Sequence, residues 1–282
     1  MVSLRNTNCQ VKQRDHATMR RQAHLHGLET LSANYFRQNF KPHAHGEYIF
    51  GVIERGVHAV WCRGSMNFVP AGSVVTMRPG DVHYGGAADR SGWRQRMLYI
   101  SEQGIRNILS DMADKEICRN LDFSAAFHAT PSLARRFIMW HAMLHESSSS
   151  LARDVALDSI MQAILNELAP ETIPEERRQP DGRILDAIEY LKSRVEEDVS
   201  LAELCVVAGL RRRQTISAFR RYTGLPPHAW HLQQKIERVK HFLRTGMSAT
   251  QAAAETGFAD QSHMARHFHA IVGMTPGTFA RG

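Results

Sequence analysis

The pattern of hydrophobic and polar residues changes once along the chain. From Asn34 to about Ile100, short apolar runs such as EYIFGVIERG, HAVWCRG and WRQRMLYIS are separated by glycine and proline, whereas residues 1–30 show no clear period. Short apolar runs with turn residues between them are typical of strands in a sandwich or barrel. The N-terminal half is therefore predicted to begin as β structure.

Beyond Ser101 the apolar residues recur with helical spacing, over residues 102–113, 132–146 and 151–169. The last of these stretches has an apolar stripe broad enough to pack on the strands or on a partner helix. Its members are Val155, Leu157, Ile160, Met161, Ile164, Leu165 and Leu168. The next segment, PETIPEERRQPDG at 170–182, is rich in proline and charge and has little to bury, which predicts an interdomain linker.

One pattern occurs twice after this linker. The segments SLAE at 200–203 and SATQ at 248–251 both have the form of a helix-starting capping box. Each short helix then reaches a glycine, Gly209 or Gly257, which can take the left-handed conformation that ends a helix. Second helices are predicted over 211–222 and 260–272. A helix, a glycine turn and a second helix form the helix-turn-helix pattern, and two matched copies are far more specific than one.

A continuous helical pattern, HAWHLQQKIERVKHFLR at 228–244, joins the two copies. At 1.5 Å per residue it spans about 25 Å, so it could hold two reading helices near the about 34 Å spacing of successive major grooves. The charge supports this interpretation. Residues 199–282 hold 11 Lys/Arg against 4 Asp/Glu, while residues 1–198 hold 24 of each. The net charge of +7 therefore lies beyond residue 198, as expected for a phosphate-binding surface.

Residues 200–280 resemble an AraC/XylS-type DNA-binding domain, above all in AGLRRRQTISAFRRYTGLPPHAW and TGFADQSHMARHFHAIVGMTPGTF. Residues 40–100 resemble the cupin-type sensor arm that often precedes such a domain, through HAHGEY, ERG, PAGSVVTMRPGDVH and GWRQRMLYIS. The resemblance implies a bacterial transcription regulator whose N-terminal half senses an effector and dimerises.

The expected fold is α+β with two domains: a cupin-like β-barrel with appended helices, and an all-α domain with two helix-turn-helix motifs joined by a linker helix. The expected boundaries are a candidate disordered segment at 1–19, a sensing and dimerisation domain at 20–169, a linker at 170–182 and the DNA-binding domain at 183–282.

The expected partners are double-stranded promoter DNA, RNA polymerase, an unknown small effector and a second copy of the chain. Enzymatic activity is not expected. No apolar run is long enough to span a bilayer and the first residues are too polar for a secretory signal, so a cytoplasmic location is expected.

The two second helices are predicted to contact DNA. In the first copy Thr215, Ala218, Phe219 and Tyr222 are expected to form the packed face. The predicted DNA-contacting residues are Arg212, Arg213, Ile216, Ser217, Arg220 and Arg221 in the first copy, and Gln261, Ser262, Ala265 and Arg266 in the second.

The resemblance implies that Arg213, Ile216 and Ser217 lie where base-contacting residues usually lie. Arg213 suits guanine and Gln261 suits adenine, while the other arginines could hold phosphates. Any one of these arginines also fits a solvated helix face. Three successive arginines at the start of a helix are, however, electrostatically unfavourable without an anion nearby.

The sharpest chemical signal in the N-terminal half is the segment HAHGE. On an extended strand His43, His45 and Glu47 would face one side, and His83 could join them from a later strand. Three uses stay open for this set: an effector pocket, a divalent metal such as Fe, Mn, Ni or Zn, or ordinary packing. In the cupin enzymes that the segment resembles, the glutamate lies four or five residues past the second histidine, at positions equivalent to Ile49 and Phe50. No cofactor is certain, and the alternative function is a metal-dependent cupin enzyme with a DNA- or partner-binding tail.

Overall fold

The structure is a computed structural model that describes residues 14–113, 120–168, 170–173 and 182–282. The strands are β1 (His16–Gln22), β2 (Leu28–Tyr35), β3 (Asn39–His43), β4 (Glu47–Cys62), β5 (Ser65–Pro70), β6 (Ser73–Met77), β7 (His83–Ala87), β8 (Trp93–Ser101), β9 (Asn120–Asp122), β10 (Phe127–Ala129) and β11 (Glu171–Ile173). The helices are α1 (Glu102–Ala113), α2 (Pro131–Glu146), α3 (Ser150–Leu168), α4 (Gly182–Ser193), α5 (Leu201–Ala208), α6 (Arg212–Thr223), α7 (Pro227–Arg244), α8 (Ala249–Glu255), α9 (Gln261–Val272) and α10 (Pro276–Ala280).

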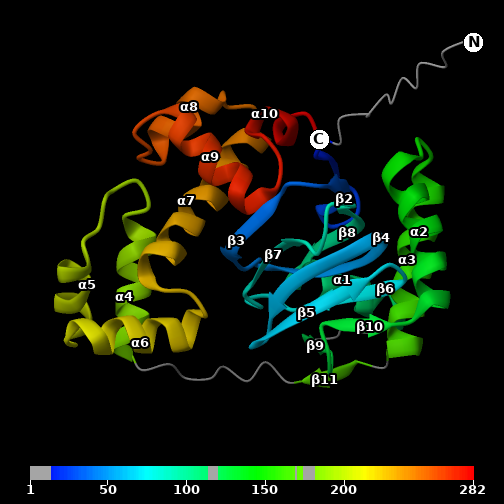
Figure 1. Ribbon diagram of the computed structural model, residues 1–282, viewed down its shortest axis with the longest axis horizontal. Coiled ribbons are helices and arrows are strands. Elements are labelled where there is room, and N and C mark those ends of the chain that lie inside the picture. The colour runs from blue at the N-terminus through cyan, green and yellow to red at the C-terminus, as the bar shows by residue number, and fades with distance from the viewer. Residues whose placement is uncertain (1–13, 114–119, 169, 174–181) are drawn as a thin grey trace, which may run out of the picture.

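The strands form two antiparallel layers that share β4. One layer has the order β1-β2-β8-β4-β6-β10, and the other joins β3, β7, β4 and β5. A register shift between Ile53 and Arg55 lies where β4 passes from one layer to the other. Just beyond this shift β4 requires a glycine, because Gly56 has φ +71° and a Cβ there would collide with the carbonyl of Gly92. The strand-rich first half and helical second half in Figure 1 confirm the predicted two-domain α+β fold.

Two strands precede the region in which strands were expected. β1 pairs with β2 along its whole length, so residues 16–19 are in a strand rather than in a disordered segment, while residues 1–13 lie outside the described part of the chain. The hydrophobic pattern did not predict β1, because only Ala17 and Gln22 of its segment HATMRRQ are buried. The predicted linker also differs from the structure, since residues 171–173 form β11 against β9; residues 174–181 are not described.

Helices α2 and α3 cover the outer face of the first layer, on the side away from the C-terminal helices (Figure 1). Phe137 and Ile160 from these helices share a core with Phe50 and Leu98 from the strands. Most of the predicted stripe of α3 is buried, but Val155 is 52% exposed. The stripe therefore packs mainly within the N-terminal domain.

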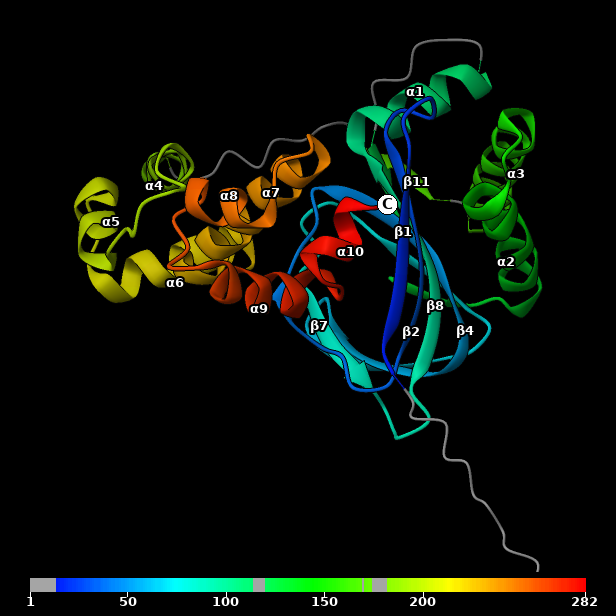
Figure 2. The same cartoon turned by 90° about the horizontal axis from the view of Figure 1, so that it is seen from above.

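The two helix-turn-helix units are stabilised in different ways. In the first unit, α5 and α6 pack with α4 around Leu204 and Phe219, in a core of their own. In the second unit, Met264 and Phe268 belong to a core that continues into the strands through Trp93. Figure 2 shows α9 and α10 lying directly beside the strands, while α4, α5 and α6 project away from them. The second unit is thus docked on the N-terminal domain. In the described part of the chain every helix is too short or too polar to cross a membrane.

Candidate DNA-binding face and effector cavity

Both predicted capping boxes form. The backbone N–H of Glu203 donates to the Ser200 hydroxyl at 3.2 Å, and the backbone N–H of Ser200 donates to the Glu203 carboxylate at 2.7 Å. The second copy repeats both bonds between Ser248 and Gln251, each at 3.3 Å. Reciprocal bonds of this kind satisfy two N–H groups that a helix start leaves without partners. The duplicated sequence pattern therefore produces a duplicated structure.

The exposed side of α6 is strongly basic. Its predicted DNA-contacting residues Arg212, Arg213, Ser217, Arg220 and Arg221 are all exposed. Thr215 and Phe219 are buried, as expected. Two expectations were wrong: Tyr222 is 46% exposed rather than packed, and Ile216 is half-buried rather than fully outward. Ile216 lines the groove between the two helix-turn-helix units.

Helix α9 presents a similar but less basic face. Gln261, Ser262 and Arg266 are exposed and Ala265 is half-buried. The start of the helix is capped by Asp260, whose carboxylate accepts the N–H of His263 at 2.6 Å. The Gln261 amide oxygen also accepts the hydroxyl proton of Thr250 from α8 at 2.7 Å. This bond orients a side chain that was predicted to meet a base.

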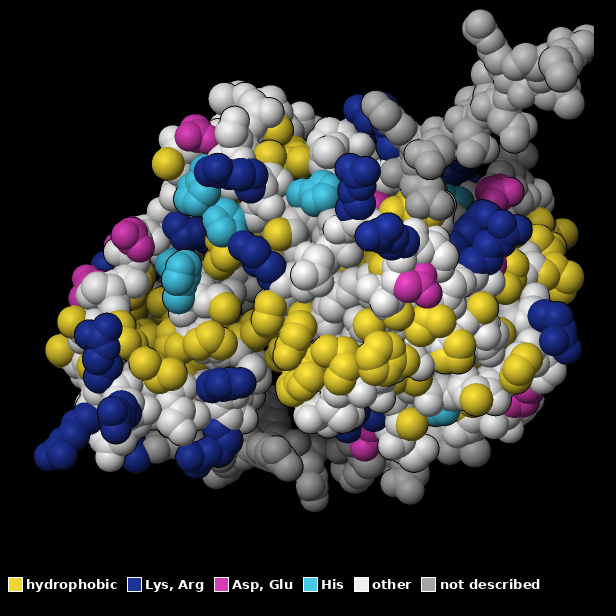
Figure 3. All heavy atoms as spheres, viewed as in Figure 1, with side chains coloured by type: hydrophobic (Ala, Val, Ile, Leu, Met, Phe, Trp, Pro, Cys, Tyr) yellow, Lys and Arg dark blue, Asp and Glu magenta, His cyan; other side chains and the backbone are white. Residues whose placement is uncertain are grey.

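The two predicted reading helices, α6 and α9, face a common space. Both pack against α7, and Figures 1 and 2 together place them on the same side of it. A groove of about 670 Å³ lies between the units, lined by Ile216 from the first and by His263 and His267 from the second. Figure 3 shows Lys, Arg and His side chains gathered on this face of the C-terminal lobe. The helices are therefore neither buried against each other nor turned to opposite sides.

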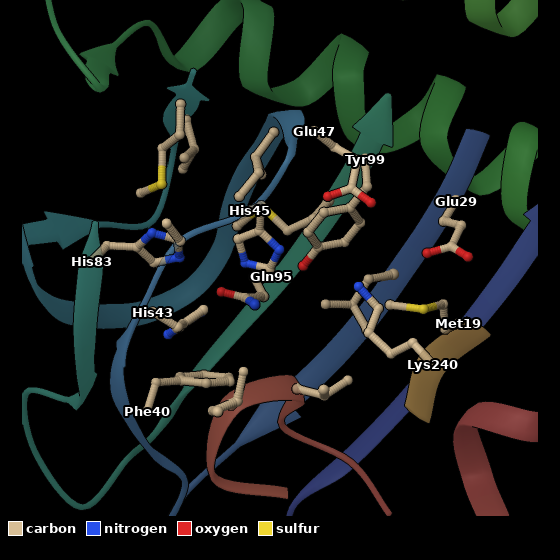
Figure 4. A pocket seen from close by; sticks show the side chains of 18 of the residues that line it. Met19, Glu29, Phe40, His43, His45, Glu47, His83, Gln95, Tyr99 and Lys240 are labelled. Atoms are coloured by element: carbon tan, nitrogen blue, oxygen red, sulfur yellow. The ribbon is translucent and has the colours of Figure 1, made fainter. Parts of the chain in front are cut away.

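A second concave site, a cavity of about 70 Å³, lies between the strands and helices α7 and α9. Three histidines from the predicted set of four meet at one end of it. One ring nitrogen from each of His43, His45 and His83 lies within 4.8 Å of the others, and Figure 4 shows the three rings close together. Burial lowers the pKa of all three below the ordinary value of 6.5, and the neighbouring imidazoles lower those of His43 and His45 further. All three are therefore neutral at pH 7.

Glu47, the fourth member of the predicted set, lies elsewhere in the cavity. β3 ends at His43 and β4 begins at Glu47, so HAHGE does not form the single extended strand that was expected. His45 lies in the connection between the strands and still reaches His83. In Figure 4 the Glu47 carboxylate lies beside Tyr99. Among the described residues, the cluster of potential metal-ligand atoms consists of the three histidines and does not include Glu47.

The cavity is also lined by residues that were not predicted. Gln95, Met97 and Tyr99 alternate along β8 and point into it. This alternation was visible in the sequence, but it does not distinguish a cavity from a packed core. His58 stacks on Trp93 with ring centroids 4.6 Å apart, and burial lowers its pKa to about 3.

Lys240 enters the cavity from α7 and is 5% exposed. Burial lowers its pKa, but the carboxylates of Glu237, Glu47 and Glu29 outweigh that effect and raise it overall. Its Nζ lies 2.8 Å from the Glu237 carboxylate, so the lysine remains charged. Gln233, Glu237 and Lys240 are spaced by four and three residues, which puts them on one helix face toward the strands. The sequence alone could not assign this helix face to the cavity, because the assignment depends on how the two domains dock.

The junction between the domains is held by specific polar bonds. The Gln233 amide nitrogen donates to the carbonyl of Ala44 at 2.6 Å, and its amide oxygen accepts the N–H of Ala44 at 2.9 Å. The Gln38 amide donates to the carbonyl of His269 at 3.0 Å, and Arg244 forms an ion pair with Glu29. α7 is thus tied to the strand ends that carry the histidines.

A sheet domain that shares a cavity with two matched helix-turn-helix units defines a DNA-binding regulator with a ligand-binding domain. The family model for the AraC-like ligand binding domain matches residues 25–165, and the model for the helix-turn-helix domain matches residues 204–282. The chain therefore belongs to the AraC-type family of transcriptional regulators.

Similar proteins span nearly the whole chain. An uncharacterized HTH-type transcriptional regulator of Bacillus subtilis, YbfI, is 22% identical over 258 residues, which cover 89% of this chain and 90% of YbfI. Among solved structures, an apo ToxT variant of Vibrio cholerae has a TM-score of 0.56 at 11% identity, covering 90% of this chain and 97% of that one. ToxT bound to (E)-4-(8-methylnaphthalen-1-yl)but-3-enoic acid has a TM-score of 0.53 at 12% identity, covering 95% and 99%. These likenesses support the two-domain fold.

Proposed function

We propose that this regulator reads promoter DNA with α6 and α9 in neighbouring major grooves. The observation that supports the proposal most strongly is that two units with similar capping boxes place α6 and α9 on one side of α7, each with an exposed polar face. Arg213 is assigned to a guanine and Gln261 to an adenine, because their side chains match the hydrogen-bonding edges of these bases. Arg212, Arg220, Arg221 and Arg266 are assigned mainly to phosphates, while Ile216, Ser217, Ser262 and Ala265 contact bases by packing or single hydrogen bonds.

Gel shifts on the DNA upstream of the protein's own gene test these roles. Arg213→Ala should relax the preference at one base pair, with a loss of about 1–3 kcal/mol against the preferred base. Arg220→Ala, on the same helix, is the matched control and should weaken binding to all sequences alike. It should also reduce the salt dependence of binding by about one phosphate contact. If both variants bound the promoter like the parent, the assignment of α6 would be wrong.

We further propose that a small effector bound in the cavity controls the regulator. A ligand there would touch groups from both domains, such as Tyr99 from β8 and Lys240 from α7. Its binding free energy would therefore depend on how the domains dock, which is the requirement for linkage between effector and DNA. The structure of ToxT with a bound organic acid supports this proposal at the level of the fold. A regulator working in this way needs no catalytic step, so we propose no enzymatic activity.

A homodimer is proposed through α2 and α3. Their outer sides expose Met139, Leu151 and Val155, which are 54%, 70% and 52% accessible. Exposed apolar side chains that form one patch mark an interaction surface, and we propose that these three do so. Sedimentation at micromolar concentration tests this proposal, since a strict monomer with and without DNA would remove it. Contact with RNA polymerase and a cytoplasmic location stay predictions.

A further inference from the structure

The size of the cavity restricts what can bind in it. Pockets for drug-sized molecules usually measure about 300–1,000 Å³, whereas this cavity measures about 70 Å³ in the docked arrangement. A water molecule needs about 10–15 Å³ of such space. The cavity therefore accommodates an ion with a few water molecules better than a bulky organic effector.

Hydrogen bonds prepare two of the three histidines, His43 and His83, for an ion. Nδ1 of His43 lies 2.7 Å from the carbonyl oxygen of Lys41, and Nδ1 of His83 lies 2.9 Å from that of Asp81. A carbonyl only accepts, so each Nδ1 carries the proton and each Nε2 keeps a lone pair. Imidazoles that bind metals almost always donate their other N–H in this way. Ordinary packing of the rings would not require this shared tautomer.

The spacing of the donors is close to what an ion needs. Zinc–nitrogen bonds of 2.0–2.1 Å place the ligands of a tetrahedral ion about 3.4 Å apart. The three ring nitrogens lie within 4.8 Å of one another, so an inward movement of about 0.8 Å per ring brings them onto one ion. Three protein ligands leave a fourth position open toward the cavity.

The charges around the cavity suit a cation. Glu237 is paired with Lys240, and Glu29 is paired with Arg244. Within the described residues Glu47 has no ion-pair partner, and its carboxylate lines the same cavity. A divalent ion on the neutral histidines would be attracted by this carboxylate, whose charge also acts on the nearby Lys240. All-imidazole ligation suits Zn²⁺ and its first-row neighbours rather than Mg²⁺ or Ca²⁺.

The site is also joined to the DNA-binding domain. Ala44 lies between two of the histidines, and both of its backbone polar groups are bound by Gln233 of α7. Gln233 is only 8% exposed, so water does not compete readily for these bonds. A movement of His43 and His45 toward an ion therefore displaces the segment that α7 holds, and α7 carries both reading helices.

We propose that His43, His45 and His83 bind a divalent transition metal ion of the Zn²⁺ type, and that Gln233 transmits its binding to the helix-turn-helix units. The second part rests on the proposed DNA-binding function, whereas the first part does not. The metal ion is then the effector, or part of the effector, of this regulator.

Titration of the chelator-treated, full-length protein with Co²⁺ and Zn²⁺ tests the metal site without DNA. Co²⁺ should give the intense visible absorption of a tetrahedral complex at one ion per chain, and Zn²⁺ should displace it. His83→Ala should reduce the affinity at least 100-fold, while His24→Ala, at an exposed histidine, is the matched control and should leave it unchanged. If His83→Ala fails to fold by thermal melting, His45→Gln takes its place. Binding below one-tenth of an ion per chain, or equal affinity in the ligand variant and the parent, would overturn the site.

Promoter binding with and without Zn²⁺ then tests the coupling. The parent protein should show at least a fivefold change in DNA affinity on addition of the metal. Gln233→Leu should keep the cobalt spectrum and lose this change, because leucine cannot bond to the Ala44 backbone. A metal effect that persists in Gln233→Leu, or that is absent from the parent, would contradict the coupling. If the protein binds no promoter DNA under any condition, the proposed function fails, and the cobalt titration still decides the metal site.

Discussion

At the scale of single residues, several imidazoles are held neutral by burial. His141 on α2 is fully buried, and its Nε2 lies 3.2 Å from the carbonyl oxygen of Met97 on β8. Burial first, and then the neighbouring His145 and Arg96, lower the pKa of His141 to about 3. Because the folded-state pKa is lower than that of the unfolded chain, the unfolded state takes up protons first as the pH falls. Stability is therefore present above about pH 6.5 and is lost as the pH falls below it.

Replacing His141 by glutamine should weaken this dependence on pH. The amide can still donate to the carbonyl of Met97 but does not titrate. We expect the loss of unfolding free energy between pH 7 and pH 5 to be about 2 kcal/mol smaller in His141→Gln than in the parent. Urea unfolding at the two pH values measures this difference. An identical loss in both proteins would show that His141 is not held neutral.

The positions of exposed residues on the reading helices could be predicted, because helical periodicity alone separates Arg213 from Phe219. The partial burial of Ile216 could not, because it depends on a groove formed with helices distant in sequence. The exposure of Tyr222 could not be predicted either, because the core of the first unit is filled by Phe219 and α4 without it. Three of the four predicted cavity residues meet as a group. The departure of Glu47 followed from the break between β3 and β4, which glycine in HAHGE permits but does not specify.

At the scale of elements, the two helix-turn-helix units have the same local chemistry and different surroundings. Gly209 and Gly257 occupy equivalent turns, with φ of +58° and +66°. A Cβ on Gly209 would meet no atom within 4 Å, whereas a Cβ on Gly257 would collide with the backbone carbonyl of Glu196. Duplicated caps and glycines made both units predictable from the sequence. The close approach of the Glu196 carbonyl to Gly257 could not be predicted from the sequence, because it depends on the packing of the segment after α4.

The two glycines provide a matched pair of variants. Gly209→Ala should cost about 1–2 kcal/mol of stability, the cost of placing an L-residue in the left-handed region. Gly257→Ala should cost about 1–3 kcal/mol more, because the neighbouring backbone must also move. Urea unfolding of the two full-length variants measures the difference. Equal losses of unfolding free energy would mean that the turn at Gly257 can move away from Glu196 at no energetic cost, which would contradict this prediction.

At the scale of the whole molecule, the second unit shares one core with the strands while the first is attached through α7. The sequence predicted two domains but not this docking, because docking depends on how the folded surfaces of the two domains fit together. Gly273 illustrates the point, since a side chain there would collide with Tyr35 and Phe40 of the N-terminal domain. The same docking forms the cavity from residues of both domains and puts the histidines next to the helix that carries the reading helices. We therefore expect the proposed control by an effector to be a property of the assembled molecule rather than of either domain.

The central claim is that one chain places two reading helices on one duplex, and a hydroxyl-radical footprint on the upstream DNA tests it most directly. At each bound half-site the account predicts two protected patches on the same face of the duplex, about 10 base pairs apart. Arg213→Ala should weaken protection in the patch contacted by α6 and leave the other patch in place. A single protected patch per half-site, or two patches on opposite faces of the duplex, would contradict the account.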